Sequence, residues 1–594
     1  MRRTADEMAE PTTPVPWSRA GLIAALACAA FGALIAALPH AIALARTGDP
    51  AWIATHDDLF FLCVGAQAYY EHPWRTGDPV LPSGGPSIHR PLPLVPGVLI
   101  ARAVGAPATA LSLIWRLWGG MLTGAALYAF FGHYLRRPAV AAAATLWILA
   151  DAGWLDSRPI VTQLIDVVRV VTGRAEPLMN GIPRIFTHWR CGTPSVTVAY
   201  LLLSAVLLDR ARRLETWPRL LAAGVGFGLL FYVYFYYWTA AVIALGLAWA
   251  FDSGRRWVYV KVGLVALAVA LPALVADVAL KRSTAPDWLT RSDKFLTIGH
   301  FAELQIPKVP IVLALATLPV VLRWRRDLLY VWGLTAGGLA LLNEQVVTAF
   351  YIENWHWIFS YGTMQTLLLV VLALGAVESH GGWTPSRLGA LWAVAVTMMA
   401  TGLWLRGIEV TQTRSARELT AEYNRYERQR LIPDAPRMEP RAIVGGDVDF
   451  VEFAAVAENI RPLQDYLVDL SPLITDSEWD ERIAFNGYLL GQDRSAFERA
   501  QRLYFEGDGK EHKAAVWGPW ARDTTVREAK IRARLAAYDR VAAEPGKSLD
   551  RYRVRYLALP AGQAPPPPRS GWERLQDGPT WALWARRATP PDRP

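Results

Sequence analysis

Apolar segments of helical length recur along the first two thirds of the chain, and short polar segments separate them. An α-helix needs roughly 20 apolar residues to cross a bilayer. The pattern therefore predicts about eleven membrane-spanning helices. These predicted spans are residues 20–45, 108–134, 138–155, 194–209, 219–235, 237–251, 257–280, 308–323, 327–343, 356–377 and 387–408.

Three apolar segments depart from regular spans. Residues 92–104 are crowded with proline, which removes helical hydrogen bonds, so we expect them to lie on the membrane surface. The aromatic run at 231–238 is expected to break residues 219–251 into two short helices. Residues 59–70 follow the first span and are expected to form an amphipathic stretch.

The sequence changes character after residue 408. Residues 1–19 form a polar cytoplasmic tail, residues 20–408 a multi-span membrane domain, and residues 409–594 a soluble domain. Periodicity in the soluble domain predicts helices at 409–432, 478–490 and 524–543, strands at 442–445 and 551–559, and a hairpin from 572–575 and 581–585. The predicted fold class is mainly α, with a small C-terminal α/β domain that contains a mixed sheet.

The charge distribution predicts the orientation of the spans. The chain is 53% hydrophobic and 19% charged, with a formal net charge of +9. Its Arg clusters fall in alternate loops, as the positive-inside rule requires of cytoplasmic loops. They are Arg136 and Arg137; Arg210, Arg212, Arg213 and Arg219; Arg255 and Arg256; Arg323, Arg325 and Arg326; and Arg387. An odd number of spans then places the C-terminal domain outside a bacterial inner (plasma) membrane. Topology thus accounts for the basic charge, and we predict no nucleic-acid partner.

The first outer loop, residues 46–91, carries His56-Asp57-Asp58 and, near its end, Arg90. Adjacent carboxylates near an apolar surface are costly to keep ionised. They are useful where one of them takes a proton from an acceptor hydroxyl. We interpret Asp57 or Asp58 as a general base, with His56 and Arg90 binding substrate. The alternative is a solvated loop in which an Asp caps a helix.

The second outer loop, residues 156–193, is basic on the side where short loops are usually poor in Arg. Arg184, His188 and Arg190 form its densest cluster. Because Arg forms paired hydrogen bonds with phosphate, this loop is predicted to bind an anionic, lipid-linked substrate. Pairing with lipid headgroups or with carboxylates of the same loop is the alternative.

A third polar cluster, residues 343–356, joins two predicted spans at the outer face and contains Glu344, Glu353 and His356. Ionisable groups at a membrane interface are functional candidates, and we assign these three to substrate binding. A hydrogen-bond network between helices is the alternative. The outer-loop histidines and acids match no metal-site spacing, so we predict no metal ligands and no required cofactor, with a divalent cation as the alternative.

This arrangement resembles the C-type (GT-C) superfamily of membrane glycosyltransferases. The shared features are a first span, an outer loop with an acidic pair, a surface helix, further spans and a soluble non-cytoplasmic domain. As a motif, the resemblance depends on His56-Asp57-Asp58 and, more loosely, on residues 343–348 and 353–357, which are similar to segments of poorly characterised bacterial members. It implies sugar transfer from a polyprenyl-phosphate carrier, with Asp57 or Asp58 as the base. An acidic pair also resembles the arabinofuranosyl-transferring members.

The predicted function is that of a membrane glycosyltransferase acting on the outer face. Its partners are a polyprenyl-phosphate sugar donor, membrane lipids, and a cell-envelope glycan, lipid or protein acceptor. One alternative is a transporter or flippase for a lipid-linked saccharide, and another is a non-catalytic GT-C-like envelope assembly protein. A transporter should place charged groups near the midplane and on both sides, whereas the unusual polar groups here gather at one face.

Overall fold

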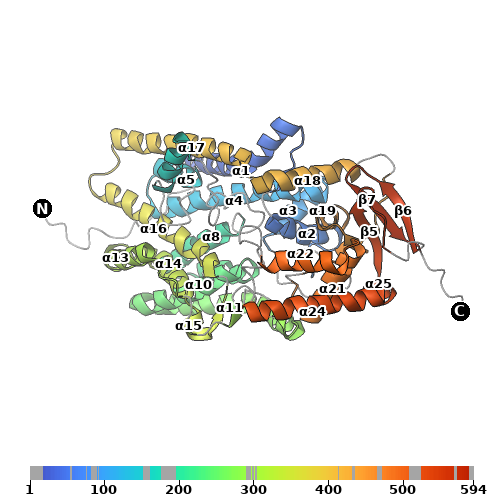
Figure 1. Ribbon diagram of the computed structural model, residues 1–594. Coiled ribbons are helices and arrows are strands. Elements are labelled where there is room, and N and C mark those ends of the chain that lie inside the picture. Colours follow the sequence, from blue (N-terminus) through green and yellow to red (C-terminus); the bar gives the residue numbers. More distant parts are fainter. Residues whose placement is uncertain are drawn as a thin grey trace.

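The structure is a computed structural model in which a bundle of helices carries a mixed α/β domain at one end (Figure 1). It describes residues 18–53, 56–74, 77–81, 90, 92–150, 161–174, 196–288, 296–297, 300–301, 304–352, 354–412, 414–430, 435–464, 468, 471–506, 523–566 and 571–587. The predicted class, mainly helical with a small C-terminal domain that contains a sheet, is confirmed.

A helix occupies each of the predicted membrane spans. The bounds are α1 (Arg19–Thr47), α4 (Leu111–Tyr134), α5 (Pro138–Ala150), α8 (Val198–Arg213), α9 (Trp217–Leu229), α10 (Phe235–Phe251), α11 (Arg256–Ser283), α13 (Lys308–Trp324), α14 (Leu329–Leu341), α16 (Ile358–Ser379) and α17 (Pro385–Gln412). Within the described residues, five helical segments are long and apolar enough to cross a membrane: Arg19–Thr47, Ala108–Tyr134, Ser253–Ser283, Ile358–Ser379 and Pro385–Ile408. The apolar helices α5 and α10 are shorter, so the count of eleven crossings stays a prediction.

Shorter elements connect these helices. They are α2 (His56–Tyr70), α3 (Val95–Ala103), η2 (Ala108–Ala110), α6 (Val161–Val171), η4 (Leu230–Tyr232), η5 (Ser253–Arg255), β1 (Leu296–Thr297), η7 (Arg326–Leu328), α15 (Gln345–Thr348), β2 (Phe350–Tyr351) and η8 (Asn354–Trp357). The turn η4 separates α9 from α10, which confirms the predicted break within residues 219–251. Helix α3 has 9 residues and is too short to cross a bilayer.

The first two long helices, α1 and α4, pack together closely because their contact surface is built from small residues. A Cβ atom on Gly32 would overlap the backbone of Gly120, and one on Gly124 would overlap the backbone of Cys28. In a bilayer the hydrophobic effect does not drive helices together, so this close backbone approach lets van der Waals contact hold them.

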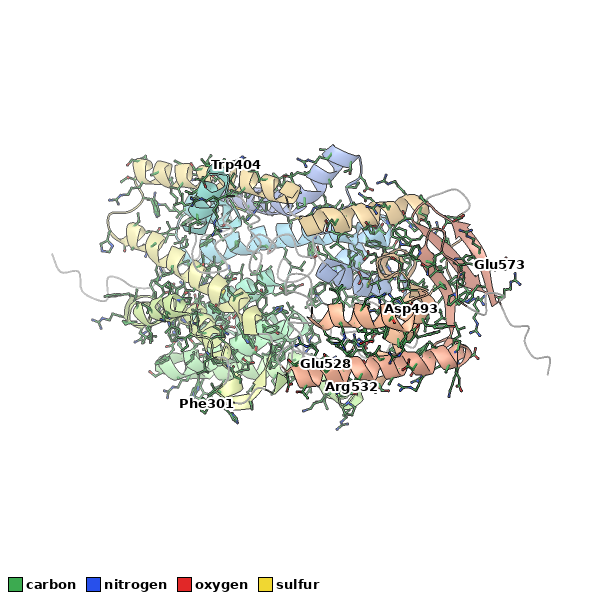
Figure 2. All side chains as sticks on the ribbon, in the orientation of Figure 1. Phe301, Trp404, Asp493, Glu528, Arg532 and Glu573 are labelled. Carbon is green, nitrogen blue, oxygen red and sulfur yellow. The ribbon has the colours of Figure 1, made fainter. Side chains whose placement is uncertain are left out.

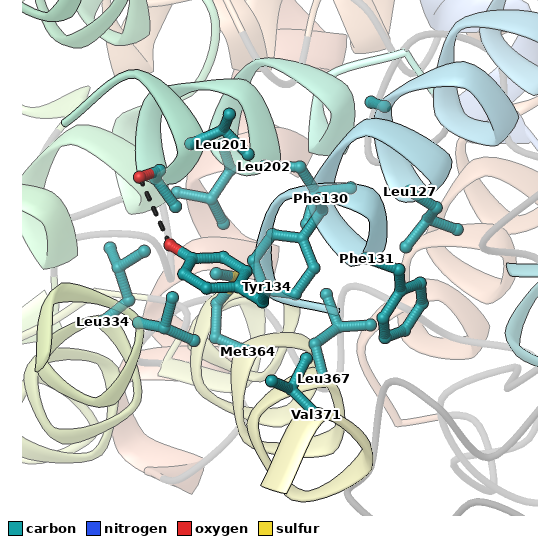
Figure 3. Packing of buried hydrophobic residues seen from close by; sticks show 14 of the residues in the cluster. Leu127, Phe130, Phe131, Tyr134, Leu201, Leu202, Leu334, Met364, Leu367 and Val371 are labelled. Atoms are coloured by element: carbon teal, nitrogen blue, oxygen red, sulfur yellow. Dashed lines mark hydrogen bonds between the residues drawn. The ribbon is translucent and has the colours of Figure 1, made fainter. Parts of the chain in front are cut away.

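The centre of the bundle is an apolar core drawn from helices that are distant in sequence. Figure 3 shows Tyr134 at the end of α4 among Leu201 of α8, Leu334 of α14 and Met364 of α16. The Tyr134 hydroxyl donates a hydrogen bond to the carbonyl oxygen of Ala205, at 3.4 Å. The polar tip of this buried ring therefore has a partner on a neighbouring helix.

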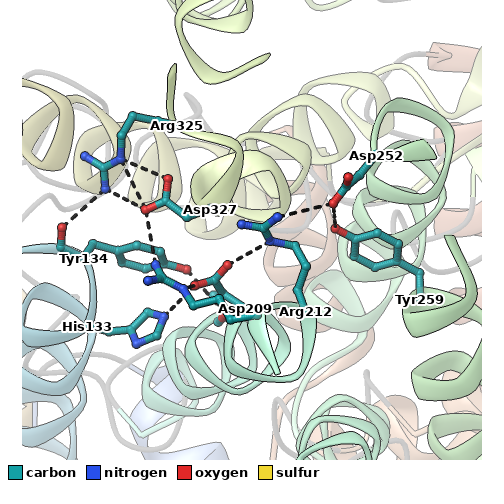
Figure 4. A network of polar contacts seen from close by, with 10 residues as sticks. His133, Tyr134, Asp209, Arg212, Asp252, Tyr259, Arg325 and Asp327 are labelled. Carbon is teal, nitrogen blue, oxygen red and sulfur yellow. Dashed lines mark hydrogen bonds and ion pairs between the residues drawn. The ribbon is translucent and has the colours of Figure 1, made fainter. Parts of the chain in front are cut away.

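Where α4 and α8 end, buried charges form a network (Figure 4). Asp209 lies 2.7 Å from Nε2 of His133, 3.0 Å from Nε of Arg212 and 2.6 Å from Nε of Arg213. The Asp209 side chain is 2% exposed, so these donors replace the water that the carboxylate has lost.

The same network reaches the loops before α11 and α14. Arg325 pairs with Asp327 at 2.8 Å, and Asp327 also lies 3.5 Å from Arg213. Asp252 accepts a hydrogen bond from the Tyr259 hydroxyl at 3.0 Å. The loops that hold several of the Arg clusters expected on the cytoplasmic side thus meet in one network (Figure 4).

The C-terminal domain is built on a five-stranded mixed sheet with strand order β4-β3-β5-β7-β6. The strands are β3 (Ile443–Gly446), β4 (Arg461–Pro462), β5 (Val554–Pro560), β6 (Trp572–Asp577) and β7 (Trp581–Arg586). Strand β3 runs parallel to β4 and β5, whereas β7 is antiparallel to β5 and β6. The predicted mixed sheet and its C-terminal hairpin are confirmed.

Six helices accompany this sheet in the described residues. They are α18 (Arg414–Arg430), α19 (Val448–Glu458), α21 (Asp476–Leu489), α22 (Arg494–Glu506), α24 (Thr524–Ala543) and α25 (Pro545–Tyr552). The sequence predicted α18, α21 and α24 but not α19, α22 or α25. The sequence pattern does not predict α19, because residues 450–457 are all buried and no polar face alternates with an apolar one.

Exposed side chains differ between the two ends of the molecule (Figure 2). On the helical bundle, Phe301 and Trp404 are 79% and 45% exposed. On the C-terminal domain, the exposed side chains labelled in the figure are charged: Asp493, Arg532 and Glu573. An apolar outer surface suits a bundle surrounded by lipid, and a charged one suits a domain surrounded by water.

The helix after the first span is not the amphipathic one expected for residues 59–70. In α2, the side chains from Asp58 to Phe60 and from Leu62 to Ala68 are buried, so the helix has no solvent-facing stripe. The expectation was wrong because the C-terminal domain covers the face that would otherwise be exposed.

The first loop and the C-terminal domain share one hydrophobic core. Leu59 and Val64 of α2, Trp115 of α4, and Phe453 and Leu557 of the C-terminal domain belong to the same cluster of buried residues. The Cys63 thiol donates to the carbonyl oxygen of Glu452 at 3.7 Å, and the Tyr70 hydroxyl to that of Ala457 at 2.5 Å.

Helix α4 relates this shared core to the charged network. The start of α4 packs into the shared core through Leu111 and Trp115, and His133 near its end lies in the network. A helix of its 24 residues is about 36 Å long. The first loop and the C-terminal domain therefore lie together, at the end of the bundle opposite the clustered Arg loops.

Glu71, directly after α2, connects the first loop to the C-terminal domain through ion pairs. Its carboxylate oxygens lie 2.8 Å from Arg441 and 2.5 Å from Arg461, and Asn459 donates at 3.2 Å. The Arg461 side chain is 2% exposed, so Glu71 is the neutralising partner of a cation that water does not reach.

Replacing Glu71 with alanine is expected to destabilise the protein by about 3 kcal/mol, the low end of the cost of removing one partner from a buried ion pair. Asp539→Ala is the matched control, because its pair with Arg494 is 51% and 54% exposed. It should cost less than about 1 kcal/mol. Thermal unfolding in detergent, followed by tryptophan fluorescence, compares the two. Equal, small shifts would show that this contact does not hold the domain.

The same contact predicts an acid dependence. Burial raises the pKa of Glu71, but hydrogen bonds from Arg441 and the charge of Arg461 outweigh this effect, and the pKa lies below its ordinary value. Glu71 therefore contributes stability above about pH 4.3 and loses it as the pH falls through the lowered pKa. The Glu71→Ala variant should show a flatter dependence of unfolding temperature on pH in this acidic range.

Candidate active site

The acidic pair lies at the start of α2, which begins at His56. The side chains of His56 and Asp57 lie outside the described part of the structure, whereas Asp58 is described and fully buried. A helix N-terminus favours negative charge, because its first backbone N–H groups have no partner within the helix. The first turn of α2 is therefore a favourable place for two carboxylates.

Asp58 forms an ion pair with Arg116, which lies in the second turn of α4. The distance from Oδ2 to Nη2 is 2.6 Å, and the two side chains are 1% and 0% exposed. A charge-assisted contact of this length is among the stronger hydrogen bonds in proteins. It fixes the start of α2 to the beginning of a long apolar helix.

Further polar groups surround the Arg116 guanidinium. Its Nη1 lies 3.1 Å from Nε2 of His40 and also hydrogen-bonds to the hydroxyl of Ser112. The guanidinium carbon lies 5.0 Å from the centre of the Trp52 ring, a cation–π distance. His40 in turn contacts the carbonyl oxygen of Pro50 through Nδ1, at 2.6 Å.

This environment separates the two aspartates chemically. A general base must reach its substrate, and it must be free to take a proton. Asp58 is sealed from solvent and paired with a guanidinium. Asp57 occupies the same helical turn and is the better candidate for the base, with Asp58 as its structural neighbour.

Arg90, predicted to bind substrate, is paired with a membrane helix. Its Nη2 lies 2.8 Å from Oδ2 of Asp277 in α11, and the side chains are 21% and 34% exposed. This contact attaches the end of the first loop to α11. The partial exposure of both groups leaves the pair accessible to water, so Arg90 stays a candidate for phosphate binding.

Glu344 lies in the turn after α14 and organises the third outer cluster. Its Oε1 accepts a hydrogen bond from the backbone N–H of Ile352 at 2.8 Å, and the residue is 8% exposed. Burial raises the pKa of Glu344, and this hydrogen bond opposes the rise without cancelling it. The described contacts match the structural alternative, a hydrogen-bond network, while substrate binding by Glu344 stays a prediction.

His356, in η8, lies in an aromatic cluster with the start of α10. Its Nδ1 hydrogen-bonds to the Tyr234 hydroxyl, and its ring stacks on Tyr236 with centroids 4.8 Å apart and an interplanar angle of 15°. Phe359 meets the same ring edge-on at 5.8 Å. The aromatic run that breaks residues 219–251 therefore positions His356.

Several predicted residues lie outside the described part of the chain: Arg184, His188, Arg190 and Glu353. The expected meeting of the acidic pair, the second loop and His356 in one cavity thus stays a prediction. Asp58 belongs to the group around Arg116, and His356 belongs to the group around Tyr234. The described residues contain no cluster of three or more His, Cys, Asp or Glu that could hold a metal ion.

Sequence reasoning missed Arg116 and His40, although a signal for both was available. Arg116 is a charged residue inside the predicted span 108–134, and His40 lies inside the span 20–45. Ionisable residues within a span usually face a partner or a functional site. The sequence did not show that these two residues meet, because 76 positions separate them.

No protein-family model matches the chain, and no curated protein matches it by sequence. Among solved structures, the chain is similar to the crystal structure of ArnT from Cupriavidus metallidurans bound to undecaprenyl phosphate. The TM-score is 0.42 at 10% sequence identity, over 96% of this chain and 99% of ArnT. A likeness of this strength does not transfer a function to this chain.

The role of Glu344 can be tested with two substitutions. Glu344→Gln keeps an acceptor for the Ile352 N–H, so the free energy of unfolding should change by less than about 1 kcal/mol, whereas Glu344→Ala should cost about 1–3 kcal/mol. Because the pKa of Glu344 is raised in the folded state, ionisation of its carboxyl group opposes folding. The stability of Glu344→Gln relative to the wild type should therefore be higher at alkaline pH. Thermal unfolding at pH 5 and pH 8 measures both effects. Equal losses for Gln and Ala would show that the loop needs the charge.

Proposed function

We propose that this protein is a membrane glycosyltransferase of the C-type superfamily. It transfers a sugar from a polyprenyl-phosphate donor to a glycan, lipid or protein acceptor of the cell envelope, on the outer face of a bacterial inner membrane. Asp57 is the general base. The placement of α2 carries the proposal: its acidic first turn is anchored to the bundle by Arg116 and lies beside the C-terminal domain.

The chemistry of such a transfer matches the residues of the predicted outer loops. The bond between the anomeric carbon and the phosphate oxygen breaks, and polyprenyl phosphate leaves with the electron pair. The acceptor oxygen forms the new bond to the anomeric carbon, and its proton passes to Asp57. The leaving phosphate gains negative charge, which cations stabilise. Arg90, Arg184 and Arg190 are our candidates for that role, with His188 or His356 assisting.

The buried charges of the bundle favour an enzyme over a transporter. Within the described membrane domain, every buried charged side chain lies in a loop or within about two turns of a helix end. These residues are Asp58, Asp78, Arg116, Asp209, Arg212, Asp252, Asp327, Glu344 and Arg406. A transporter needs polar groups near the midplane to hold its substrate during passage. A reaction at the membrane surface needs no such groups at the midplane, and the buried charges described in this bundle lie toward its two ends.

The sidedness of this arrangement is open to a direct test. Reporter fusions after Arg90 and after Arg430 should both report the non-cytoplasmic side, because the segments they follow lie at the same end of the bundle. A fusion after Arg213 should report the cytoplasm, since that residue belongs to the charged network at the other end. Opposite compartments for the first two fusions would contradict the proposed topology.

The proposed base predicts the effect of one substitution. Asp57→Asn should lower sugar transfer by about two orders of magnitude or more, the usual loss for a positioned general base. Asp49→Asn is the matched control in the same loop, because an amide oxygen can still accept the hydrogen bond from the Ala51 N–H. Transfer is measured by product analysis with a panel of polyprenyl-phosphate sugars. Full activity of Asp57→Asn would remove this mechanism.

A further inference from the structure

A series of buried polar contacts connects three segments of the protein beside the proposed base. His40 comes from the last third of α1, Arg116 from the second turn of α4, and Asp58 from the first turn of α2. The residues are 3%, 0% and 0% exposed, so water does not compete for their hydrogen bonds. The contacts run from the Pro50 carbonyl through His40 and Arg116 to Asp58.

Each contact in this chain has a defined direction. The Pro50 carbonyl oxygen can only accept, so Nδ1 of His40 donates across the 2.6 Å contact. A guanidinium can only donate, so Nε2 of His40 accepts from Arg116 across 3.1 Å. One ring nitrogen carries a hydrogen and the other carries a lone pair. His40 is therefore neutral, in the tautomer protonated at Nδ1.

Arg116 contacts both Asp58 and His40, which the single charged nitrogen of a lysine would not reach together. Its Nη2 donates to Asp58, while its Nη1 donates to His40 and to the Ser112 hydroxyl. The planar fork of the guanidinium holds these donors at fixed angles. The ring of Trp52 lies at a cation–π distance from it, and the Ser112 hydroxyl donates to the Trp52 carbonyl at 3.4 Å. A lysine would offer one charged nitrogen in place of the fork.

We propose that His40, Arg116 and Asp58 form a positioning relay for the proposed catalytic aspartate. The inference rests on the proposed function, since it assigns Asp57 the chemistry and Asp58 the anchoring. Asp58 ties the first turn of α2 to Arg116, and His40 ties Arg116 to the loop that follows α1. The relay fixes where that turn lies, and therefore the backbone position of Asp57. His40, Arg116 and Asp58 act as positioning residues and do not touch the substrate.

The relay has a structural readout and a catalytic one. His40→Gln and Arg116→Lys each interrupt it while keeping a polar or charged side chain. In the full-length protein in detergent, both variants should increase hydrogen exchange of the backbone amides from Asp58 to Phe61. Both should lower kcat by about 10²-fold, the effect of misplacing a catalytic group by about 1 Å, with little change in KM. The fall in rate at acidic pH, which protonation of the base causes, should persist in His40→Gln, Arg116→Lys and Asp58→Asn. It should disappear in Asp57→Asn.

His133→Gln is the matched control. Like His40→Gln, it removes a buried histidine contact, here the 2.7 Å contact between His133 and Asp209. His133 lies near the end of α4 that is far from Arg116. It should leave exchange at Asp58–Phe61 and kcat unchanged, even where it lowers the unfolding temperature. The same changes in His133→Gln as in His40→Gln would overturn the relay, because general destabilisation would then explain them.

The remaining outcomes separate the relay from the proposed function. Wild-type exchange and wild-type kcat in both His40→Gln and Arg116→Lys would overturn the relay. Loss of the fall in rate at acidic pH in Asp58→Asn, with its retention in Asp57→Asn, would make Asp58 the base and also overturn the relay. If the wild-type protein transfers no sugar from any donor, the glycosyltransferase proposal fails. The exchange measurement then decides the relay alone: increased exchange in the two variants supports it.

Discussion

A carboxylate removed from water is stable only beside a cation or several hydrogen-bond donors, and both ends of this helical bundle are built around that constraint. At one end, Asp209 draws together His133, Arg212 and Arg213, so the loops that precede and follow several spans converge there (Figure 4). At the other end, Asp58 forms an ion pair with Arg116, and both residues are fully buried. The contacts Asp209–His133 and Asp58–Arg116 join residues 76 and 58 positions apart, and so contribute to the tertiary arrangement.

The C-terminal domain packs directly on the helix that carries the candidate site. Its core residues and those of α2 form one hydrophobic cluster, and Glu71 neutralises a domain arginine that is almost fully buried. A second attachment lies after α11, where the backbone N–H of Ala285 donates to the carbonyl oxygen of Pro472 at 2.8 Å. With these attachments the domain holds α2 from one side while α4 holds it from the other. A loop supported on both sides keeps its groups in a fixed geometry, as the proposed transfer chemistry requires.

The adjacent residues Asp57 and Asp58 are assigned different roles because their positions differ. In the sequence, both residues are adjacent carboxylates of the first outer loop, and only the family resemblance favours Asp57, because it is the first acidic residue of that loop. Asp58 is buried in an ion pair with Arg116, and the proposed mechanism therefore assigns proton transfer to Asp57. The cost of burying Asp58 is offset by the guanidinium, and a third group, neutral His40, orients that guanidinium. This arrangement of a reactive group, an anchor and an orienting residue is common in catalytic sites.

The sequence by itself determined the elements that depend on local periodicity. Helices were predicted at all the positions where long apolar runs occur, and the C-terminal hairpin and mixed sheet followed from alternation and turn residues. The break between α9 and α10 followed from the aromatic run, whose residues Tyr234 and Tyr236 hold His356. Only the tertiary structure decided the environment of each group. Helix α2 is buried because a domain about 400 residues later covers it, and periodicity within one segment carries no information about that partner. Likewise, Arg116 and His40 were visible as polar residues within spans, but their meeting with Asp58 depends on the close packing of α1 against α4, which brings side chains from three segments to one point.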